Sequence, residues 1–476
     1  MTGKELAAEN ERLRAENAEL KKRVAELEAL VKALQERLEA AQRAGKRQAA
    51  PFSKGEPKAN PKQPGRKVGH PPTHRAKPER VEQVEDAPLP IVCPGCGGVV
   101  TEDKVEPQYQ IDIPPVQPVI TQFNVHVGHC VSCGQRLQGR HPQQTSDALG
   151  AAAVQLGPRA LGLAAEAKHE LGVPYGKISR FFASAFGLTV CRAAWARAGQ
   201  RLAQRAQPVY HKLLEVLRAS RRACVDETGW KVGGKLAWLW VFTNEAVTLY
   251  VIDPTRAHEV AERILGEDFT GVVHCDCFLA YDPLPYDQQK CLRHLIRRSD
   301  ELTESQRGAA VKFSRQVAQL LRGAIRLKHR LTAGQISPAG FRVARGRLEA
   351  ALDRLLAGRY TDPDNAKLAK LLRKHREQLL VFLYEEAVAP TNAEGEQEIR
   401  PAVAVRKMSA CNRSWKGADV HAVLTSVIRT CRKHGQEFLE LIIERLRHPT
   451  AALPAWLNEL APAGRPTTEE LATGPP

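Results

Sequence analysis

The 476-residue sequence predicts a multidomain α+β protein, in which an N-terminal coiled coil and a small cysteine-rich domain precede an α/β core interrupted by a helical insertion. Three observations predict this class: a leucine repeat at the N-terminus, two CxxC pairs after it, and strand-like runs that begin near residue 222. Lys and Arg outnumber Asp and Glu by 70 to 53, so we expect a polyanionic partner, either nucleic acid or an anionic membrane surface. No apolar run approaches the roughly 18–20 residues of a membrane helix, and the charged N-terminus does not resemble a signal peptide, which excludes membrane-spanning and secreted classes.

Residues 1–43 carry the pattern of a leucine-zipper coiled coil. Leucine occupies every seventh position, and a companion position follows four residues after each: Leu6, Leu13, Leu20, Leu27 and Leu34, then Asn10, Asn17, Val24, Val31 and Leu38. This repeat keeps one seam of a helix facing a partner, and Asn in the seam favours a parallel dimer. We expect self-association through residues 4–42, at least to a dimer. The alternative is a single amphipathic helix packed on its own domain.

Residues 44–82 are expected to form an extended, basic, proline-rich linker. Residues 43–80 contain eleven basic and two acidic side chains, and residues 51–78 contain seven prolines without any apolar period. Such a segment cannot bury enough apolar surface to offset the entropy of ordering. Its basic pair, Arg66 and Lys67, could enter a DNA minor groove, although any basic linker also binds phosphates nonspecifically.

Residues 83–145 have the cysteine spacing of a zinc ribbon. Cys93 and Cys96 form one CxxC pair, and Cys130 and Cys133 form another 33 residues further on. Two such pairs complete the tetrahedral four-thiolate shell that structural Zn²⁺ prefers, and the residues at 109–127 are expected to form short strands. A pair of redox motifs is the alternative, but no βαβ pattern surrounds either pair. Eleven cysteines, an odd number, also favour a reducing compartment over a disulfide scaffold.

Residues 150–220 are predicted to be helical. Gly157-Pro158 opens one helix, a second covers 177–186, and a third starts near Thr189. Short helices joined by glycine-containing turns could form a DNA-binding helix-turn-helix, and ordinary helical packing explains the pattern equally well.

From residue 221 the pattern changes to that of an α/β core. Three strand-like runs, at 223–232, 237–244 and 246–253, are separated by short turns. A helix-like stretch at 258–266 and a fourth strand at 271–277 follow them. A meander of three strands, a crossover helix and a fourth strand begin a ribonuclease-H-like fold. If the first and fourth strands pair, Asp226 and Asp276 meet at one sheet edge. A carboxylate in so apolar a strand is costly to bury unless it binds a cation, and Cys275 and Cys277 face the other way as core residues.

The order of these features resembles the large transposase subunit of the insertion sequence 66 family. The resemblance rests on the zipper, the linker run Phe52-Ser-Lys-Gly-Glu-Pro-Lys, the cysteine pairs, and the runs Val-Asp226-Glu-Thr, Asp276-Cys-Phe-Leu-Ala-Tyr281 and Glu396-Gln-Glu-Ile-Arg-Pro401. It covers nearly the whole chain. It implies a DDE transposase whose ribonuclease-H-like catalytic core is interrupted by a helical insertion and cuts and joins DNA with divalent metal.

The resemblance places the third acid at Glu396, by matching back from Arg400 and Pro401. The sequence departs from the family pattern nearby, since Thr391-Asn392-Ala393 replaces the usual Asp-Asn-Asn run, Gln397 replaces Arg, and Cys277 replaces Gly. Glu394 and Glu398 therefore remain rival third ligands. On a helix, Glu396 would share a face with Arg400, which could orient it.

Three acids suit a site for two Mg²⁺ or Mn²⁺ ions, because these ions prefer carboxylate oxygens and can serve both the attacking and the leaving oxygen of a phosphodiester. The implied partners are double-stranded DNA, as inverted-repeat ends and as target, and small accessory proteins of the same element. The implied location is the bacterial cytoplasm, associated with the nucleoid. The alternatives are a DNA-binding regulator or architectural protein with an inert core, and a nuclease or resolvase that cuts without joining.

The segment between the second and third acids is expected to be a basic helical insertion. Residues 290–377 contain twenty-one basic and eight acidic side chains. Core boundaries of 221–298 and 389–448 leave 299–388 for the insertion and 449–476 for a flexible tail. Lys and Arg near the second acid would hold DNA phosphates, and the candidates are His294, Arg297 and Arg298. A core or surface role for His294 is an equal alternative.

Overall fold

The computed structural model describes residues 3–46, 69 and 74–460, so the predicted DNA contacts Arg66 and Lys67 lie outside the described residues. The chain divides into two compact units, Met1–Pro114 and Pro115–Pro476. Among the described helices, none combines the length and apolar character needed to cross a bilayer.

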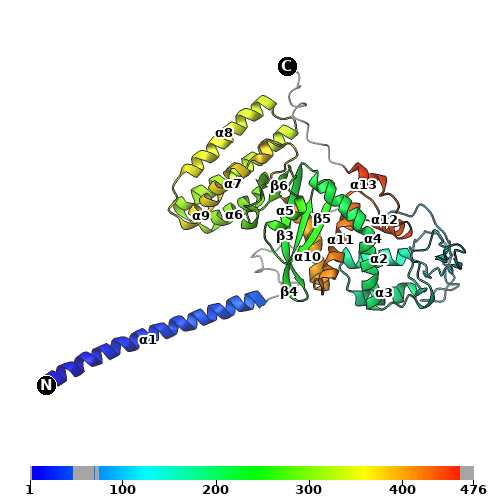
Figure 1. Cartoon of the computed structure of the whole chain (residues 1–476), viewed down its shortest axis with the longest axis horizontal. Helices are drawn as coiled ribbons and strands as arrows, with labels where there is room; N and C mark the ends of the chain where they lie inside the picture. The colour runs from blue at the N-terminus through cyan, green and yellow to red at the C-terminus, as the bar shows by residue number, and fades with distance from the viewer. Residues whose placement is uncertain (1–2, 47–68, 70–73, 461–476) are drawn as a thin grey trace. The chain divides into compact units, whose positions relative to one another are not determined.

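The first unit contains one long helix, α1 (Gly3–Lys46), drawn in blue in Figure 1. Four leucines of the predicted seam, Leu13, Leu20, Leu27 and Leu34, are 48–60% exposed in the single chain. The same unit holds the first cysteine pair in a tight turn. The Cys93 N–H donates to the Gly98 carbonyl at 2.9 Å, and Val92 and Val99 form a short antiparallel bridge around the turn.

The second unit begins with a two-stranded hairpin that carries the other cysteine pair. Strands β1 (Val127–His129) and β2 (Arg136–Gln138) are antiparallel, and Cys130 and Cys133 lie in the connecting turn. Between residues 109 and 126, all of them described, the backbone forms neither helix nor strand, so the short strands predicted there are wrong except for the start of β1.

Three helices follow, in the predicted order: α2 (Pro158–His169), α3 (Tyr175–Phe186) and α4 (Arg192–Arg218), after the short η1 (Gly150–Ala152). Gly187, in the left-handed region at φ 65°, ends α3, as a helix C-terminus favours. Phe182 and Trp195 pack in the same hydrophobic cluster as the strand residue Val225. The three helices are thus continuous with the core of the sheet.

The centre of this unit is a five-stranded mixed sheet (Figure 1). Its strands run in the order β5-β4-β3-β6-β7: β3 (Arg222–Val232), β4 (Lys235–Thr243), β5 (Thr248–Asp253), β6 (Val272–Cys275) and β7 (Gln288–Lys290). Strands β3, β4 and β5 form an antiparallel meander, and α5 (Glu259–Leu265) leads to β6, which pairs parallel to β3. The predicted side-by-side pairing of the first and fourth strands is therefore confirmed. The short edge strand β7 was not predicted.

Helices cover both faces of the sheet. One face packs Val225 and Phe242 in the cluster that includes residues of α4 and α5. The opposite face packs Trp230 and Tyr250 against α10 (Ala393–Ser409). Helix α11 (Trp415–Lys433) lies against β5, and α12 (Phe438–Arg447) and α13 (Ala455–Glu459) complete the unit.

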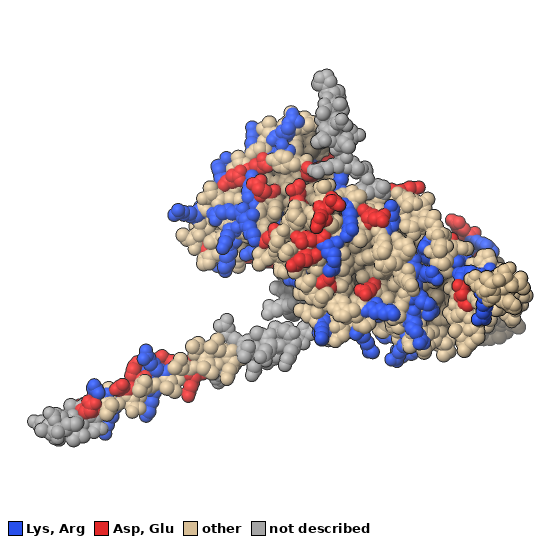
Figure 2. Space-filling view, viewed as in Figure 1, with Lys and Arg blue, Asp and Glu red and all other residues tan. Residues whose placement is uncertain are grey.

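A helical lobe is inserted between β7 and α10, where the sequence predicted long basic helices. Its elements are α6 (Leu292–Ser305), η3 (Gly308–Ala310), α7 (Val311–Thr332), α8 (Pro338–Ala357), α9 (Pro363–Lys374), η4 (Arg376–Gln378) and η5 (Val381–Leu383). Val317, Leu321 and Leu352 belong to a hydrophobic cluster centred on this lobe. Figure 2 shows Lys and Arg along its outer edge, with Asp and Glu between them.

The predicted flexible tail, 449–476, needs correction in the part that is described. Residues 449–460 include α13, whose Leu457 is fully buried, and Leu460 lies in the same core cluster. These two leucines anchor the segment on the core, so the prediction of a loose chain does not hold for residues 449–460.

Candidate active site

The strand register brings Asp226 and Asp276 to the same place on the sheet. Strands β3 and β6 pair in parallel with Cys224 opposite His274. The same register, continued two residues further, places Asp226 beside Asp276, which directly follows β6, and the Asp276 carboxylate is close enough to raise the pKa of Asp226. Alternation along β3 puts Asp226 on the face of Trp230, the face that α10 covers. The Asp276 carboxylate accepts the Phe278 N–H at 2.8 Å, which orients it at the start of the following loop.

Asn392 fixes the N-terminus of α10 beside Asp226. Its side-chain amide donates to the Val225 carbonyl at 2.8 Å, and its own N–H donates to the Cys291 Sγ at 3.2 Å. A Cβ on Gly395 would lie 2.8 Å from the Asn392 Oδ1, so the close packing here requires glycine. The first helical turn, which carries Glu396, is therefore held against the strand that carries Asp226.

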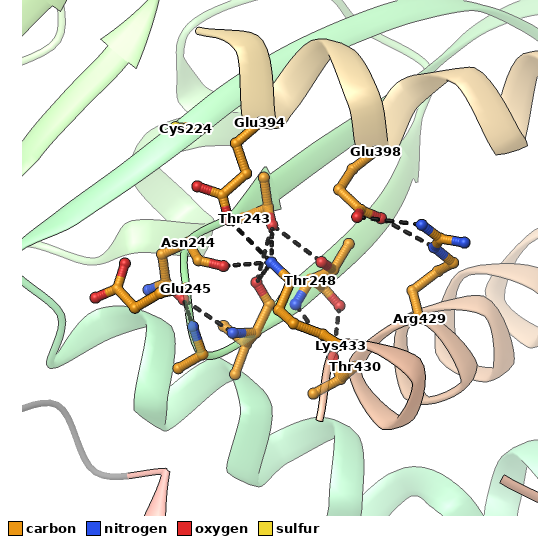
Figure 3. Close-up of polar contacts among 12 residues, drawn as sticks. Cys224, Thr243, Asn244, Glu245, Thr248, Glu394, Glu398, Arg429, Thr430 and Lys433 are labelled. Atoms are coloured by element: carbon orange, nitrogen blue, oxygen red, sulfur yellow. Dashed lines mark hydrogen bonds and ion pairs between the residues drawn. The ribbon is translucent and has the colours of Figure 1, made fainter. Parts of the chain in front are cut away.

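The three glutamates of α10 do not share a face. Glu394 forms ion pairs with Arg222 at 2.9 Å and Lys433 at 3.0 Å, and Glu398 accepts two hydrogen bonds from Arg429 at 2.9 and 3.2 Å. In Figure 3, Glu394 and Glu398 extend from the same side of the helix toward Lys433 and Arg429. Glu396 lies midway between them in sequence, which places it on the opposite side of the helix.

Glu396 has looser partners than its neighbours. Its carboxylate lies 3.9 Å from the Arg293 guanidinium and 3.8 Å from the His294 Nδ1, both on α6. Arg400, the partner expected from the sequence, is exposed and forms no ion pair with Glu396 among the described residues. Cys291, His294 and Glu396 have potential ligand atoms within 4.8 Å of one another. His294 thus lies at the acidic cluster itself, and its Nδ1 is buried without a hydrogen bond within the described chain.

The cluster carries uncompensated negative charge. Burial, followed by the carboxylate of Glu227 and those of Asp276 and Glu396, raises the pKa of Asp226 to about 7. Neither Asp226 nor Asp276 takes part in an ion pair that the described residues supply. The carboxylate oxygens of Asp226, Asp276 and Glu396 are the ligands that a hard divalent cation such as Mg²⁺ or Mn²⁺ prefers, and the side chains of His294 and Cys291 lie beside Glu396.

A second acid of the first motif was missed by the sequence reasoning. Glu227 points to the other face of β3, with its side chain only 3% exposed, and forms an ion pair with Arg256 at 2.6 Å. The Tyr281 hydroxyl donates to the same carboxylate. Arg256 in turn stacks on the Phe278 ring, 3.5 Å from its centroid. These contacts join the Asp226 and Asp276 motifs across the sheet, and a glutamate directly after Asp226 in an apolar strand was the available signal.

The two cysteine pairs adopt the same local geometry in their separate units. In each, the N–H four residues after the first cysteine donates to the carbonyl of that cysteine at 2.8 Å, from Gly97 to Cys93 and from Gly134 to Cys130. Backbone N–H groups of the turn lower the pKa of the Cys93 and Cys130 thiols. Each turn therefore favours thiolates, the form that binds Zn²⁺, while a site shared by the pairs remains a prediction.

The remaining predicted DNA contacts that are described lie on α6. Arg297 and Arg298 are exposed, and Arg297 approaches Glu301 at 4.0 Å. They follow His294 by one turn, so the helix that contacts Glu396 also presents these two cations to solvent.

Comparison with known proteins agrees with this geometry. No curated protein matches the chain. The family model described as "Transposase IS66 family" matches residues 153–420, more than half of the chain, from α2 through the sheet, the insertion and α10 into α11. Members of this family are DDE transposases, which implies an enzyme that binds DNA. The chain therefore belongs to the IS66 family of transposases.

Proposed function

We propose that the chain cuts DNA at the ends of its element and joins those ends to target DNA, with Asp226, Asp276 and Glu396 as the catalytic acids of a ribonuclease-H-like core. The sheet order, an antiparallel meander followed by two parallel strands, supports this fold. The observation that carries the proposal is the convergence of the three carboxylates, seen in the β3–β6 register and in the charges of Asp276 and Glu396 acting on Asp226.

These three acids would hold two divalent cations, Mg²⁺ or Mn²⁺. When bound, such ions activate the attacking oxygen and stabilise the charge on the leaving oxygen. In the first reaction a water oxygen attacks the phosphorus at the element end, and the 3′ oxygen leaves and takes a proton. In the second, that 3′-hydroxyl attacks a phosphodiester of the target, whose own 3′ oxygen leaves. One set of acids serves both reactions, because each is an in-line substitution at phosphorus.

The test uses the purified full chain and a supercoiled plasmid that carries the inverted repeats flanking its coding sequence. With Mg²⁺, wild-type protein should nick at the repeats, and Asp226→Asn and Asp276→Asn should abolish nicking while keeping DNA affinity. Asp300→Asn is the matched control, because Asp300 pairs with Arg322 in the insertion. Cleavage by both site variants at the wild-type rate would overturn the assignment.

The same assay separates the alternatives. A regulator or architectural protein with an inert core would bind the repeats without nicking them. A nuclease or resolvase would nick them but would not join the 3′ ends to a second plasmid. Asp226 and Asp276 form no ion pair among the described residues, and Glu396 has only contacts of 3.8–3.9 Å, whereas Glu394 and Glu398 are ion-paired at 2.9–3.0 Å; this contrast favours an active core.

We propose in addition that Cys93, Cys96, Cys130 and Cys133 bind one structural Zn²⁺, supported by the matching hydrogen bonds of the two turns. Purified protein should contain one zinc per chain. Cys130→Ser should lose it, whereas Cys191→Ser, at an exposed cysteine outside the pairs, should retain it. Zinc retained in full by the Cys130 variant would exclude the four-thiolate site.

Self-association through the leucine seam of α1 completes the proposal. Leucines that are half exposed along one helix gain stability by burial against a second copy. Leu20→Lys should shift the chain from dimer to monomer in sedimentation, whereas Lys21→Gln, at the adjacent position outside the seam, should not. Accessory proteins of the element and the exposed Arg297 and Arg298 remain further candidates for contacts with the DNA complex.

A further inference from the structure

A large basic cavity lies in the second unit, away from the three acids. Its volume is about 1360 Å³, it is open to solvent, and it is lined by three segments: the end of α2 with the start of α3, the start of α4, and the loop from α10 into α11. Nothing in the reaction described above uses this cavity. Its lining residues come from helices α2, α3 and α4, from the loop 410–414, and from the adjoining ends of α10 and α11.

Five cations line the cavity: Lys168, Lys177, Arg180, Arg192 and Arg413. The lining residues, all of them described, include no Asp or Glu. None of the five cations takes part in an ion pair within the described part of the chain, although the Lys168 ammonium lies 5.2 Å from the Tyr175 ring centroid. Burial without a compensating carboxylate lowers the pKa of Lys168. This concentration of positive charge is unbalanced, and an anion would relieve it.

Three helices begin at the cavity wall. Helix α3 starts after Pro174 and α4 after Cys191, and neither N-terminus has a side-chain cap, whereas Ser414 caps α11. The first N–H groups of a helix lack partners within the helix, and the helix dipole favours negative charge there. The cavity thus combines five unpaired cations with two uncapped helix N-termini, and both features select an anion.

The cavity wall is packed closely where these features meet. A Cβ on Gly176 would lie 3.0 Å from the Arg192 Nε, so the Arg192 guanidinium rests directly on the first turn of α3. A side chain at position 176 would displace it. The charge of Arg192 is therefore held at the N-terminus of α3, next to Lys177.

We propose that this cavity binds consecutive backbone phosphates of the DNA on which the enzyme acts. The inference rests on the proposed function, because it assumes that DNA is the polyanion. Helix α10 connects the two sites, with Glu396 near its start and Ser409 at the cavity. Thirteen residues of helix span about 20 Å, or roughly six base pairs of duplex, so one DNA segment can reach both.

The test measures DNA affinity as a function of salt for a 30-bp fluorescent duplex that carries one inverted repeat. The triple variant Lys177→Gln/Arg180→Gln/Arg192→Gln should weaken binding at least tenfold and reduce the slope of log K against log salt by about 2.7, since each phosphate contact contributes about 0.9. The matched control is Arg201→Gln/Arg205→Gln/Lys235→Gln, three exposed cations outside the cavity, which should change the slope by less than about 1.

Arg413→Gln, on the opposite wall, gives an independent check that does not depend on α3 or α4 folding, and it should lower the slope by about 0.9. An unchanged slope in both cavity variants overturns the inference. Pyrophosphate, added at constant ionic strength, tests whether the cavity binds a small free anion instead of DNA. In that case it should raise the melting temperature of the wild type but not of the triple variant, while both proteins keep the same salt slope for DNA binding. That result would overturn the inference. If the wild type nicks the plasmid but the cavity variants have the wild-type salt slope, the proposed function stands and the cavity inference fails. If the wild type does not nick but the cavity variants have a reduced slope, the cavity inference stands and the proposed function fails.

Discussion

Glu396→Gln and Glu398→Gln should have opposite consequences for stability and activity, although the two residues are only two positions apart on α10. The Glu398 side chain is 12% exposed and is held by Arg429 at 2.9 and 3.2 Å. Breaking a buried ion pair costs about 3–5 kcal/mol, but glutamine keeps one hydrogen bond and Arg429 keeps its contact with Glu170. We therefore expect Glu398→Gln to lower the free energy of unfolding by about 2 kcal/mol.

Glu396→Gln should leave stability nearly unchanged and remove activity. Its closest cation is the Arg293 guanidinium, 3.9 Å away on a side chain that is 61% exposed, so this pair contributes about 0–1 kcal/mol. Partners that merely orient a metal ligand contribute about 10- to 100-fold to affinity or activity, so loss of a ligand should reduce nicking by more than about 100-fold.

The assay pairs urea unfolding without added Mg²⁺ with Mg²⁺-dependent nicking of the repeat-bearing plasmid below the melting temperature of every variant. Glu394→Gln provides the second control, since Glu394 joins Arg222 and Lys433 and should behave like Glu398. If Glu396→Gln nicks normally while folded Glu398→Gln or Glu394→Gln does not, the two faces of α10 have been assigned the wrong way round.

Two further predictions follow from buried polar contacts. Tyr281→Phe removes the donor to the buried Glu227 and should lower the free energy of unfolding by about 1–3 kcal/mol in urea titration; no change would show that the hydrogen bond contributes nothing. His169 and His421 share an Nδ1–Nδ1 hydrogen bond of 3.0 Å, and burial with the charge of nearby Lys168 lowers their pKa, to about 3 for His421. Below about pH 6.5 these histidines are protonated in the unfolded chain but remain neutral in the folded chain. The free energy of unfolding should therefore fall as the pH drops, by about 2 kcal/mol per histidine at pH 5. Urea midpoints at pH 7.5 and 5 test this, with a His421→Gln variant expected to show a smaller loss; equal losses would contradict it.

Local pattern was enough for the elements that position the first two acids. The apolar runs around Asp226 and Asp276 have strand periodicity, and a carboxylate within each is conspicuous because burial there is costly. The β3–β6 pairing then follows from the usual neighbourhood of strands joined by a short crossover.

Edge strand β7 could not be recognised in the same way. Its residues Gln288, Gln289 and Lys290 are polar in sequence, yet all three are buried. Their polar atoms are satisfied inside the protein: the Lys290 Nζ donates to the Gln288 Oε1 at 2.8 Å, and the Gln289 amide donates to the Leu379 carbonyl at 3.0 Å. Hydropathy alone cannot predict burial that depends on partners about 90 residues away.

The choice among the three glutamates of α10 was beyond the sequence for a related reason. Helical spacing shows that Glu394 and Glu398 share a face and Glu396 does not, but it cannot say which face carries compensating cations. Arg222, Lys433 and Arg429 come from β3 and α11, and only the tertiary structure places them. The prediction that Arg400 orients Glu396 was wrong, because Glu396 contacts Arg293 and His294 of α6 instead of the residue four positions further along its own helix.

The insertion explains how an acid so far along the chain can join the other two. Its ends meet at the core, where the Leu292 N–H donates to the Pro390 carbonyl at 3.0 Å and the Asn392 N–H to the Cys291 Sγ. The entropy of closing a loop grows only logarithmically with its length, so a lobe with its own hydrophobic cluster can occupy the interval without straining the sheet. Helix α6 begins at this junction and α10 begins where the chain returns to it, so His294 and Glu396, each in the first turn of its helix, lie next to each other. The cations of the lobe therefore start within one turn of the acids, which is where a phosphate-binding surface has to begin.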